Sequence, residues 1–534
     1  MLSEAQLSVI KSLSSPKTYG AKVKTVEVYN THLSVLFLAG DYVYKLKRAI
    51  LTPDVDFSTY QKRKLACLQE MKRSTFYAPR LVVGLKTVRK LKNGRIVIGG
   101  KKGDEIDTVL VLKRVPEKYL LNRLLQSGDF ERFEMMDLAE NIVSLHSKSK
   151  VYKNKWGAGV IQKIILDQEA YMISSSLPGF SNEDINCWAK TCLENLRANE
   201  ALISFRQKTG YVRKCHGDLL LSNIACMDKK FYFFSPISYD ETLECVDTLY
   251  DLATLTMDLE VAGAKGLANI LFNHYMAYMN DMEGVPLMTL YQSIQAMSRA
   301  VDFLKRQPFV NKSKQKSSLA QAKKYFKFAC QSINCFNPVL IACGGLLGSG
   351  KSTIARAVAG QLDPAPGAVI LQDDIVRKQI LGLLPHQPME SAYLTPAFDK
   401  VVYDVLRQRA RSALAAGSCV LIDALFYDAK ERHSMELLAA EMHIPFIGLW
   451  MNAPLAVRQE RIKSRANNPY DRTYEKGLDD YFKGQTGRIS WYKIPTDMSM
   501  KDSIKKAVRH LKKKFSFTCS CGKHGAFCSI KRKG

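Results

Sequence analysis

The 534-residue sequence lacks any apolar run of the length that a membrane-spanning helix needs, about 18 to 20 residues. Its first residues include an acid and no apolar core of a signal peptide, so we expect an amphipathic helix there and a cytoplasmic protein. Its 13 cysteines are mostly scattered singly through apolar segments. That usage is typical of buried thiols in a reducing compartment and argues against a disulfide framework.

Acidic residues are scarce relative to basic ones. The 51 Asp and Glu stand against 78 Lys and Arg, which gives a net charge of +27, and residues 501–534 hold eleven basic residues and one acid. A basic surface attracts nucleic acid, anionic lipid or phosphorylated ligands. No basic patch interleaved with aromatic residues stands out, so nucleic acid is a candidate partner that competes with an ordinary solvated, lysine-rich surface.

What the sequence does contain is a glycine-rich loop between a strand-like run and a helical pattern. Gly345, four further residues, and then Gly350, Lys351 and Ser352 have the Walker A spacing. Backbone N–H groups of such a loop close around the β-phosphate of a nucleotide. We expect Lys351 to reach the β- and γ-phosphates of ATP and the Ser352 hydroxyl to ligate Mg²⁺. The other loop residues predicted to bind the cofactor are Gly348, Ser349 and Thr353.

Two apolar strand-like runs after this loop end in acids. The first ends in Asp373 and Asp374, and Arg377 follows in the next helical pattern. P-loop kinases of small molecules and polynucleotides place an acid at this strand end. We therefore expect Asp374 to take the proton of the acceptor hydroxyl and Arg377 to hold the substrate. The competing interpretation of Asp374 is an N-cap. The second run ends in Asp423, a Walker B-like carboxylate for the magnesium site.

Further along, three arginines recur at helical spacing. Arg458, Arg461 and Arg465 share one helix face. The segment resembles the lid helix of nucleoside- and gluconate-type kinases, whose arginines clamp the transferring phosphate. The resemblance implies that role for Arg461 and Arg465, and the competing interpretation is a solvated basic face.

Four soft metal ligands lie close together near the end of the sequence. They are Cys519, Cys521, His524 and Cys528, and thiolates and imidazoles are the ligands that Zn²⁺ prefers. The spacing is not that of a standard zinc finger. A zinc site therefore competes with an unstructured basic tail over residues 516–534.

The first half of the sequence has the pattern of strands followed by helices. A strand carries Lys45 and a later helix carries Glu70, which in a kinase would pair and orient the lysine toward nucleotide phosphates. His216, Asp218 and Asn223 have the spacing of a kinase catalytic loop. In that loop the aspartate accepts the substrate hydroxyl proton and the asparagine ligates a metal.

Residues 20–310 resemble the aminoglycoside phosphotransferase-like half of a bacterial bifunctional protein, in which it is fused to a P-loop, AAA or zeta-toxin-like kinase half. The resemblance implies a protein-kinase-like α+β domain over 1–335 and an α/β P-loop NTPase domain with a parallel sheet over 336–515. Within the first domain, the Lys- and Ser-rich stretch 311–318 predicts a loop. The segments that match include Gly40-Asp-Tyr-Val-Tyr-Lys45, Cys67-x-x-Glu70, Cys215-His-Gly-Asp218-Leu and Asp247-x-x-Tyr250-Asp251-Leu-Ala.

One departure from this family bears on activity. After the catalytic loop the family has Phe-Asp-x-Ile-Glu-Phe, whereas this chain has serine for both acids, at Ser235 and Ser238. In the family the aspartate holds Mg²⁺ between the phosphates, and a neutral hydroxyl is a poor substitute. Asp240 is near but out of register. We expect a degenerate, nucleotide-binding or regulatory domain in which Asp218 and Asn223 are remnants.

Together these patterns predict an ATP-dependent phosphotransferase whose chemistry lies in the C-terminal half and whose acceptor is a small hydroxylated metabolite. A polynucleotide 5′-hydroxyl kinase is the second enzyme hypothesis, supported by the acids before Arg377 and by the net charge. The non-catalytic hypothesis is a nucleotide-gated regulatory ATPase. The products separate the three hypotheses: a phosphorylated metabolite, a labelled nucleic-acid end, or only slow ADP formation.

Overall fold

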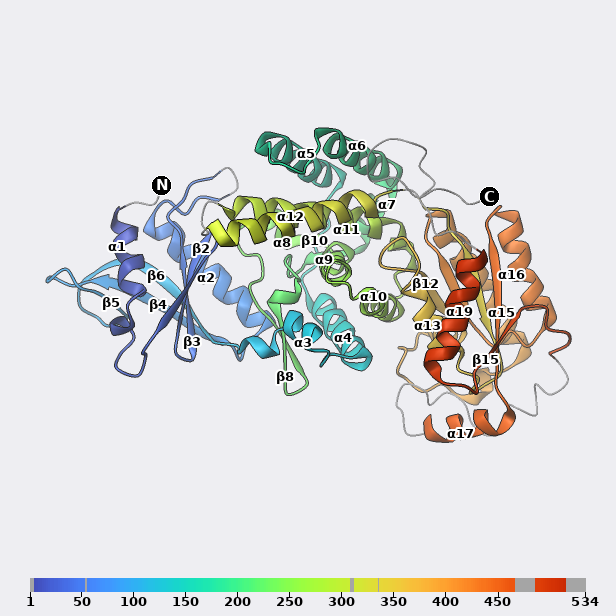
Figure 1. Ribbon diagram of the computed structural model, residues 1–534. Helices are drawn as coiled ribbons and strands as arrows, with labels where there is room; N and C mark the ends of the chain where they lie inside the picture. Colours follow the sequence, from blue (N-terminus) through green and yellow to red (C-terminus); the bar gives the residue numbers. More distant parts are fainter. Residues whose placement is uncertain (1–3, 53–54, 308–311, 335, 466–485, 515–534) are drawn as a thin grey trace.

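The computed structural model describes residues 4–52, 55–307, 312–334, 336–465 and 486–514. Its N-terminal sheet lobe is a six-stranded antiparallel sheet in the order β1-β2-β3-β6-β4-β5 (Figure 1). Helix α1 (Glu4–Leu13) buries Val9 and Leu13 in the same cluster as Val35 and Phe37 of the sheet. Helix α2 (Tyr60–Tyr77) begins where the Thr59 side chain accepts a hydrogen bond from the Lys62 amide. The strands are β1 (Val26–Asn30), β2 (Ser34–Ala39), β3 (Tyr42–Lys47), β4 (Val82–Lys90), β5 (Ile96–Ile98) and β6 (Asp104–Lys113).

A helical lobe follows and packs around helix α9, whose residues from Thr248 to Glu260 are all buried. A helix that is buried all round lies at the centre of its domain. Two short antiparallel ribbons, β7 with β10 and β8 with β9, carry the loop that contains Asp218. The strands are β7 (Val212–Lys214), β8 (Ile224–Met227), β9 (Lys230–Phe233) and β10 (Cys245–Asp247). The helices are α3 (Leu121–Ser127), α4 (Arg132–Lys148), α5 (Ala158–Ser175), α6 (Asn182–Ala198), α7 (Glu200–Thr209), α8 (Glu241–Glu244), α9 (Thr248–Val261), α10 (Lys265–Met279), α11 (Met288–Lys305) and α12 (Lys312–Ser332).

The predicted loop at 311–318 is wrong, because helix α12 begins at Lys312. Polar residues dominate its first turns, but lysine is a good helix former. The helix is then stabilised by packing, since Ala322, Phe326 and Ala329 are buried in the core cluster that also holds Ile294 of α11. That packing is invisible in a local sequence window.

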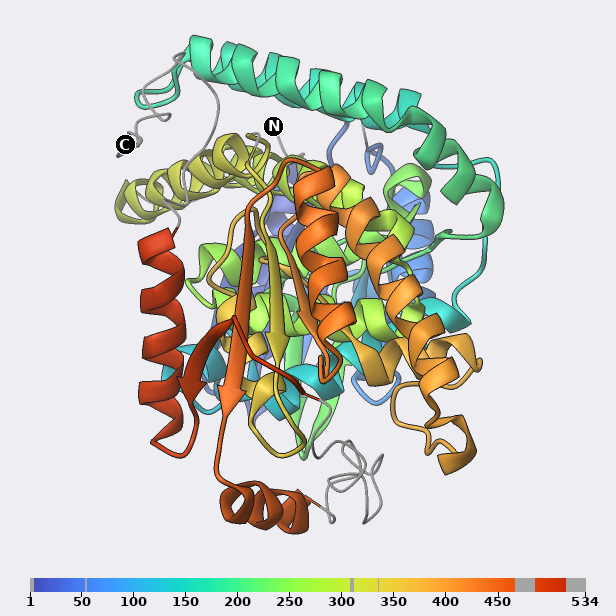
Figure 2. The ribbon, with the colours of Figure 1, turned by 90° about the vertical axis from the view of Figure 1, so that its right-hand side faces the viewer.

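The P-loop half is a five-stranded parallel sheet in the order β12-β13-β11-β14-β15. Strands β11 and β13 are buried along their whole length, as expected for a parallel sheet with helices on both faces (Figure 2). The strands are β11 (Leu340–Gly344), β12 (Val369–Gln372), β13 (Val420–Asp423), β14 (Phe446–Asn452) and β15 (Tyr492–Pro495). The helices are α13 (Lys351–Ala359), α14 (Asp373–Ile380), α15 (Pro396–Ala415), α16 (Ala429–Glu441), α17 (Leu455–Arg465) and α19 (Met500–Lys514).

The two halves meet where helix α10 covers edge strand β12. Asn269 Nδ2 donates to the carbonyl oxygens of Pro366 and Ala368 at 2.9 and 3.0 Å. Asn273 Nδ2 donates to Ala368 O at 3.1 Å, and Asn273 Oδ1 accepts from Ile370 N at 2.7 Å. An edge strand presents unpaired N–H and C=O groups, so these asparagines complete the hydrogen bonding that the sheet itself leaves open.

Within the part of the chain that the structure describes, no helix has both the length and the apolar content to cross a membrane.

Candidate nucleotide and phosphotransfer sites

The glycine-rich loop connects β11 to α13 and is shaped by positive backbone angles. Gly345, Gly348 and Gly350 have φ of +144°, +73° and +88°, which residues other than glycine rarely adopt. At Gly348 a Cβ atom would also lie 2.5 Å from the carbonyl oxygen of Arg458, and at Gly345 it would lie 2.7 Å from Ser349 Oγ. The loop therefore needs glycine for both its conformation and its close packing.

Helix α13 begins at Lys351, with Gly350 as its N-cap. Ser352 and Thr353 follow in its first turn and are half-buried, and the first N–H groups of a helix have no partner within the helix. The Ser349 hydroxyl is buried and has no hydrogen-bond partner among the described residues. Lys351 Nζ donates to Leu346 O at 3.3 Å, which curls the side chain over the loop. These features fit the phosphates of ATP.

Three carboxylates lie at the carboxyl ends of β12 and β13. The glycine-rich loop begins at this same end of the sheet, after β11. Gln372 and Asp423 are register partners, and Gln372 Nε2 donates to Asp423 Oδ2 at 2.9 Å. Asp373 Oδ2 accepts from Leu425 N at 3.1 Å, and Asp373 Oδ1 accepts from Asp374 N at 2.8 Å. Asp423 and the Ser352 hydroxyl are the oxygen ligands that would hold Mg²⁺ here.

The two adjacent acids have different electrostatic surroundings. Burial raises the pKa of Asp373, the carboxylates of Asp374 and Asp423 raise it further, and Lys351 and Arg377 oppose the rise. Burial followed by Asp423 raises the pKa of Asp374, which Lys378 opposes. The P-loop lysine therefore acts on Asp373, a residue to which the sequence argument assigned no role. The sequence contained a signal for this residue, because Asp373 directly follows the last residue of β12.

The arginines predicted for the site have different partners near this end of the sheet. Arg377 is buried, forms an ion pair with Asp399 and donates to Tyr393 O at 3.0 Å. Arg461 Nη1 donates to Gly348 O at 3.4 Å, and Arg461 Nη2 donates to Thr496 O at 2.5 Å, so this side chain lies against the glycine loop. Arg465 ends helix α17, and its side chain lies outside the described residues.

The four ligands proposed for Zn²⁺, which are Cys519, Cys521, His524 and Cys528, also lie outside the described residues.

In the sheet lobe, the Lys45–Glu70 ion pair forms as the sequence predicts. Lys45 Nζ lies 2.5 Å from Glu70 Oε1, and Lys47 Nζ lies 2.5 Å from Glu70 Oε2. Burial would raise the pKa of Glu70, but the attraction of the two lysines outweighs it and lowers the pKa to about 2. Lys47 was not assigned to this pair from the sequence, although a signal was available: Lys47 lies two residues after Lys45 and therefore on the same face of β3.

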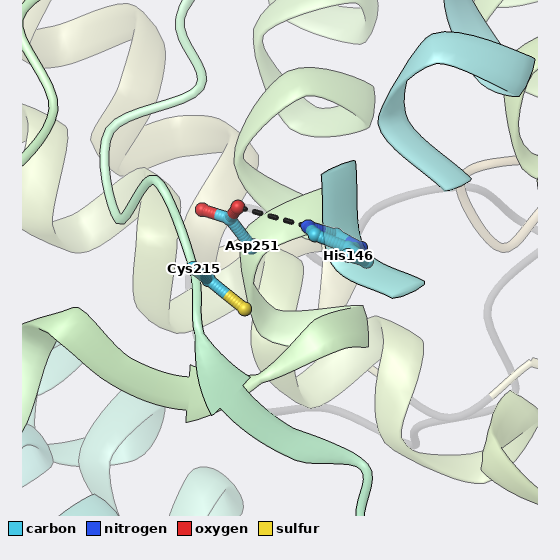
Figure 3. A group of neighbouring side chains, drawn as sticks. All are labelled: His146, Cys215 and Asp251. Carbon is cyan, nitrogen blue, oxygen red and sulfur yellow. Dashed lines mark hydrogen bonds and ion pairs between the residues drawn. The ribbon is translucent and has the colours of Figure 1, made fainter. Parts of the chain in front are cut away.

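The loop with Asp218 is organised by a buried carboxylate from helix α9. Asp251 accepts hydrogen bonds from the amides of His216 and Gly217 at 3.0 and 2.7 Å. Asp251 Oδ2 also lies 3.1 Å from His146 Nε2, next to the Cys215 thiol (Figure 3). His146 Nδ1 bonds to the Tyr275 hydroxyl at 2.8 Å. Since every polar atom of this His–Asp pair has a protein partner, the group serves as a hydrogen-bonded support for the loop.

Asp218 and Asn223 are brought together, with Asn223 Nδ2 donating to Asp218 Oδ2 at 2.8 Å. Burial raises the pKa of Asp218 to about 6. Asp240, the acid that follows the two serines in the sequence, does not take the place of the missing acids, whereas Asp302 of α11 is an electrostatic neighbour of Asp218. Asp240 caps helix α8, accepting from Thr242 N at 2.8 Å, and Ser238 is buried.

The family comparison concerns the C-terminal half. Residues 340–481 match the family model described as an AAA domain. Together with the parallel sheet, this match indicates a P-loop domain in the C-terminal half.

Over 461 residues the chain is 25% identical to an uncharacterised protein of Mycobacterium tuberculosis, covering 84% of this chain and 88% of that protein. Among solved structures, it resembles an ethanolamine kinase of Plasmodium vivax with 11% identity and a TM-score of 0.36, over 58% of this chain and 83% of that one. It also resembles a gluconokinase of Sinorhizobium meliloti with 16% identity and a TM-score of 0.25, over 34% and 94% respectively.

Proposed function

We propose that this chain is an ATP-dependent phosphotransferase whose P-loop half transfers the γ-phosphate of ATP to a hydroxyl group of a small metabolite. The observation that carries the proposal is the cluster of Asp373, Asp374 and Asp423 at the carboxyl ends of the strands. Lys351 is an electrostatic neighbour of Asp373 in this cluster. A lysine cation and helix N–H groups bind phosphates, and a neighbouring carboxylate with a raised pKa is suited to accept a proton.

In the transfer step, the acceptor hydroxyl gives its proton to a carboxylate of the Asp373–Asp374 pair while its oxygen bonds to the γ-phosphorus. The bond from that phosphorus to the β–γ bridging oxygen breaks, and ADP leaves. Lys351 and Arg461 would balance the negative charge on the phosphoryl group, and Mg²⁺, when bound, would supply further positive charge. Arg377 is buried in its pair with Asp399, so we assign it to positioning the segment that begins α15.

Variants of the two acids test which one accepts the proton. We expect one of Asp373→Asn and Asp374→Asn to retain ATP binding while transfer falls by about a hundredfold or more. The sequence pattern favours Asp374, and the proximity of Lys351 supports Asp373. Transfer from labelled ATP to a panel of hydroxyl compounds measures activity, and calorimetry measures binding. Normal transfer in both variants would remove the acid pair from the mechanism.

The P-loop lysine tests the location of the chemistry. We expect Lys351→Ala to abolish turnover or to weaken ATP binding at least tenfold, because the β- and γ-phosphates lose their cation. The control is Lys324→Gln, an exposed lysine on α12. Full transfer by the Lys351→Ala chain would move the activity to the kinase-like half.

The second candidate is a polynucleotide 5′-hydroxyl kinase. It is favoured by a groove of about 560 Å³ between α13 and α19 whose cations are Lys505, Arg509, Lys512 and Lys513. A basic groove on the helix that starts at Lys351 would attract a phosphate backbone. Labelling of a 5′-hydroxyl oligonucleotide, with activity that falls steeply as salt rises, would select this candidate over a metabolite kinase. Slow ADP formation without any labelled acceptor would instead select a regulatory ATPase.

For the kinase-like half we propose a non-catalytic role. Its Lys45–Glu70 pair and its Asp218–Asn223 pair are formed, but Ser235 and Ser238 bring no charge to a metal. Divalent cations prefer anionic oxygen ligands, so we expect this half to transfer no phosphate at a useful rate.

A further inference from the structure

Helix α11 ends beside the Asp218 loop with two arginines, Arg299 and Arg306, whose electrostatic neighbours include the carboxylates of Asp302 and Asp218. Arg299 and Arg306 both lie near the ring of Phe303, with their guanidinium carbons 4.8 and 6.0 Å from the ring centroid. Arg299 Nη1 lies 3.6 Å from Asp302 Oδ2. Figure 1 shows α11 and α12 side by side, with one end of the pair near the sheet lobe. His32, in the turn between β1 and β2, has Asp302, Lys305 and Arg306 among its electrostatic neighbours, so this corner lies close to that turn.

The charge of Arg306 is incompletely neutralised. Burial would lower the pKa of Arg299, but the attraction of Asp302, Asp218 and Asp258 outweighs it and raises that pKa. The pKa of Arg306 is lowered by burial and next by the charge of Arg299, and Asp302 and Asp218 only partly oppose this. Among the described residues Arg306 forms no ion pair. Arg306 is half-buried with a buried Nε atom. A cation partly removed from water without a partner is unfavourable, so the arrangement favours an anion.

Several polar atoms at the same corner are buried without hydrogen-bond partners among the described residues. They are His32 Nδ1, Arg299 Nε, Arg306 Nε and Gln307 Nε2. His32 lies in the β1–β2 turn, and its electrostatic neighbours are Asp302, Arg306, Lys305 and Arg48. Polar groups from the sheet lobe and the helical lobe therefore converge at one place.

We propose that Arg299 and Arg306, with His32 from the opposite lobe, form an anion site that holds a phosphate group of a small phosphorylated ligand without a divalent metal. Guanidinium groups match phosphate oxygens in paired hydrogen bonds and keep their charge at any physiological pH. In this half the arginine side chains supply the positive charge that faces the phosphate. In a kinase with acids at positions 235 and 238, bound Mg²⁺ would supply that charge instead. The inference rests on the proposed non-catalytic role of this half.

The test uses the full chain with Lys351→Ala, so that the P-loop does not contribute tight nucleotide binding. ATP, pyrophosphate and inorganic phosphate are titrated by calorimetry in EDTA and again in Mg²⁺. We expect at least one of the three to bind as well in EDTA as in Mg²⁺. Adding Arg306→Gln should weaken that binding at least tenfold, whereas adding Lys324→Gln, a change of the same charge on exposed α12, should change it less than twofold. A preference for ATP over pyrophosphate would identify a nucleotide as the source of the phosphate.

Thermal unfolding separates a binding role from a structural one. Without ligand, Arg306→Gln should raise the melting temperature, because it removes the repulsion between two arginines, and phosphate should stabilise the parent more than this variant. Arg306→Lys keeps the positive charge but loses the paired N–H donors of the guanidinium. This variant should therefore bind phosphate with an affinity between those of the parent and of Arg306→Gln. Absence of binding by all three probes, strict dependence on Mg²⁺, or unchanged binding in Arg306→Gln would overturn the inference. These results leave the proposed P-loop activity untouched, since that activity is measured with Lys351 intact.

Discussion

Glu70 is the residue at which the sheet lobe concentrates opposite charges in a buried place. Its side chain is 3% exposed, and the Lys45 and Lys47 side chains are 16% and 4% exposed. Removing one partner of a buried ion pair leaves uncompensated charge, which costs about 3 to 5 kcal/mol. Glu70 therefore matters to the fold of this lobe whether or not Lys45 contacts a nucleotide.

We predict that Glu70→Gln destabilises the protein at neutral pH by about 3 kcal/mol. The pKa of Glu70 in the fold is about 2, below the ordinary value of 4.5. Its contribution is therefore fully present above about pH 4.5 and is lost as the pH falls toward 2. Denaturant unfolding between pH 7 and 3 should show the difference between the two proteins shrinking on acidification.

The control for this variant is Glu194→Gln, at an exposed position of α6. It should change stability by less than about 0.5 kcal/mol at every pH. A difference between Glu70→Gln and the unaltered chain that stays constant down to pH 3 would contradict the ion-pair account.

At the scale of elements, the loop between β11 and α13 depends on how closely α17 packs against it. Arg458 and Arg461 of α17 both approach the backbone of Gly348, the first through its carbonyl oxygen and the second through its guanidinium. The arginine helix and the nucleotide loop are thus held in one unit, which the spacing of the arginines alone did not predict.

We predict that Gly348→Ala weakens ATP binding at least tenfold, because the added Cβ would lie 2.5 Å from Arg458 O and the loop must open. Gly417→Ala is the matched control. Gly417 has φ of +81°, but nothing lies within 4 Å of its Cβ position. It should lose about 1 kcal/mol of stability from backbone strain without affecting nucleotide affinity. Equal affinity losses in both variants would show that positive φ, rather than α17, is responsible.

At the scale of the whole molecule, the two halves share a continuous apolar core. One cluster contains Leu271 of α10 together with Val369 of β12 and Val402 of α15. Arg409 of α15 also donates to Asn280, just after α10, at 2.9 Å. The acids that follow β12 therefore come directly after a strand whose outer edge is covered by α10 of the N-terminal half.

We predict that Asn273→Ala destabilises the protein by about 1 to 3 kcal/mol, because the part-buried Ile370 N loses its partner and Ala368 O keeps only the hydrogen bond from Asn269. Hydrogen exchange should locate the effect, with the Ile370 amide losing protection first. Asn141→Ala is the control, since Asn141 is exposed on α4 and bonds within its own helix. Unchanged exchange at Ile370 would show that the edge of β12 is held in another way.

By itself the sequence determined the features whose parts are adjacent in the chain. The glycine loop with Lys351 and Ser352, the acid-terminated strands at Asp373 and Asp423, and the Asp218–Asn223 spacing each lie within a few residues, so local patterns contain them. The serines at positions 235 and 238 could also be recognised from the sequence, because the identity of a residue is read directly from it.

Only the tertiary structure decided which distant residues meet. Arg306 lies about ninety positions after Asp218, and Asn273 about a hundred before Ile370, separations of which a local pattern carries no trace. The different surroundings of Asp373 and Asp374 also come from the fold, because two neighbouring acids differ only in what surrounds them. Helix α12 makes the same point, since its first turns look like a loop until the burial of Ala322 and Phe326 is counted. In each case the deciding free energy comes from burial and charge between segments that chain folding alone brings together.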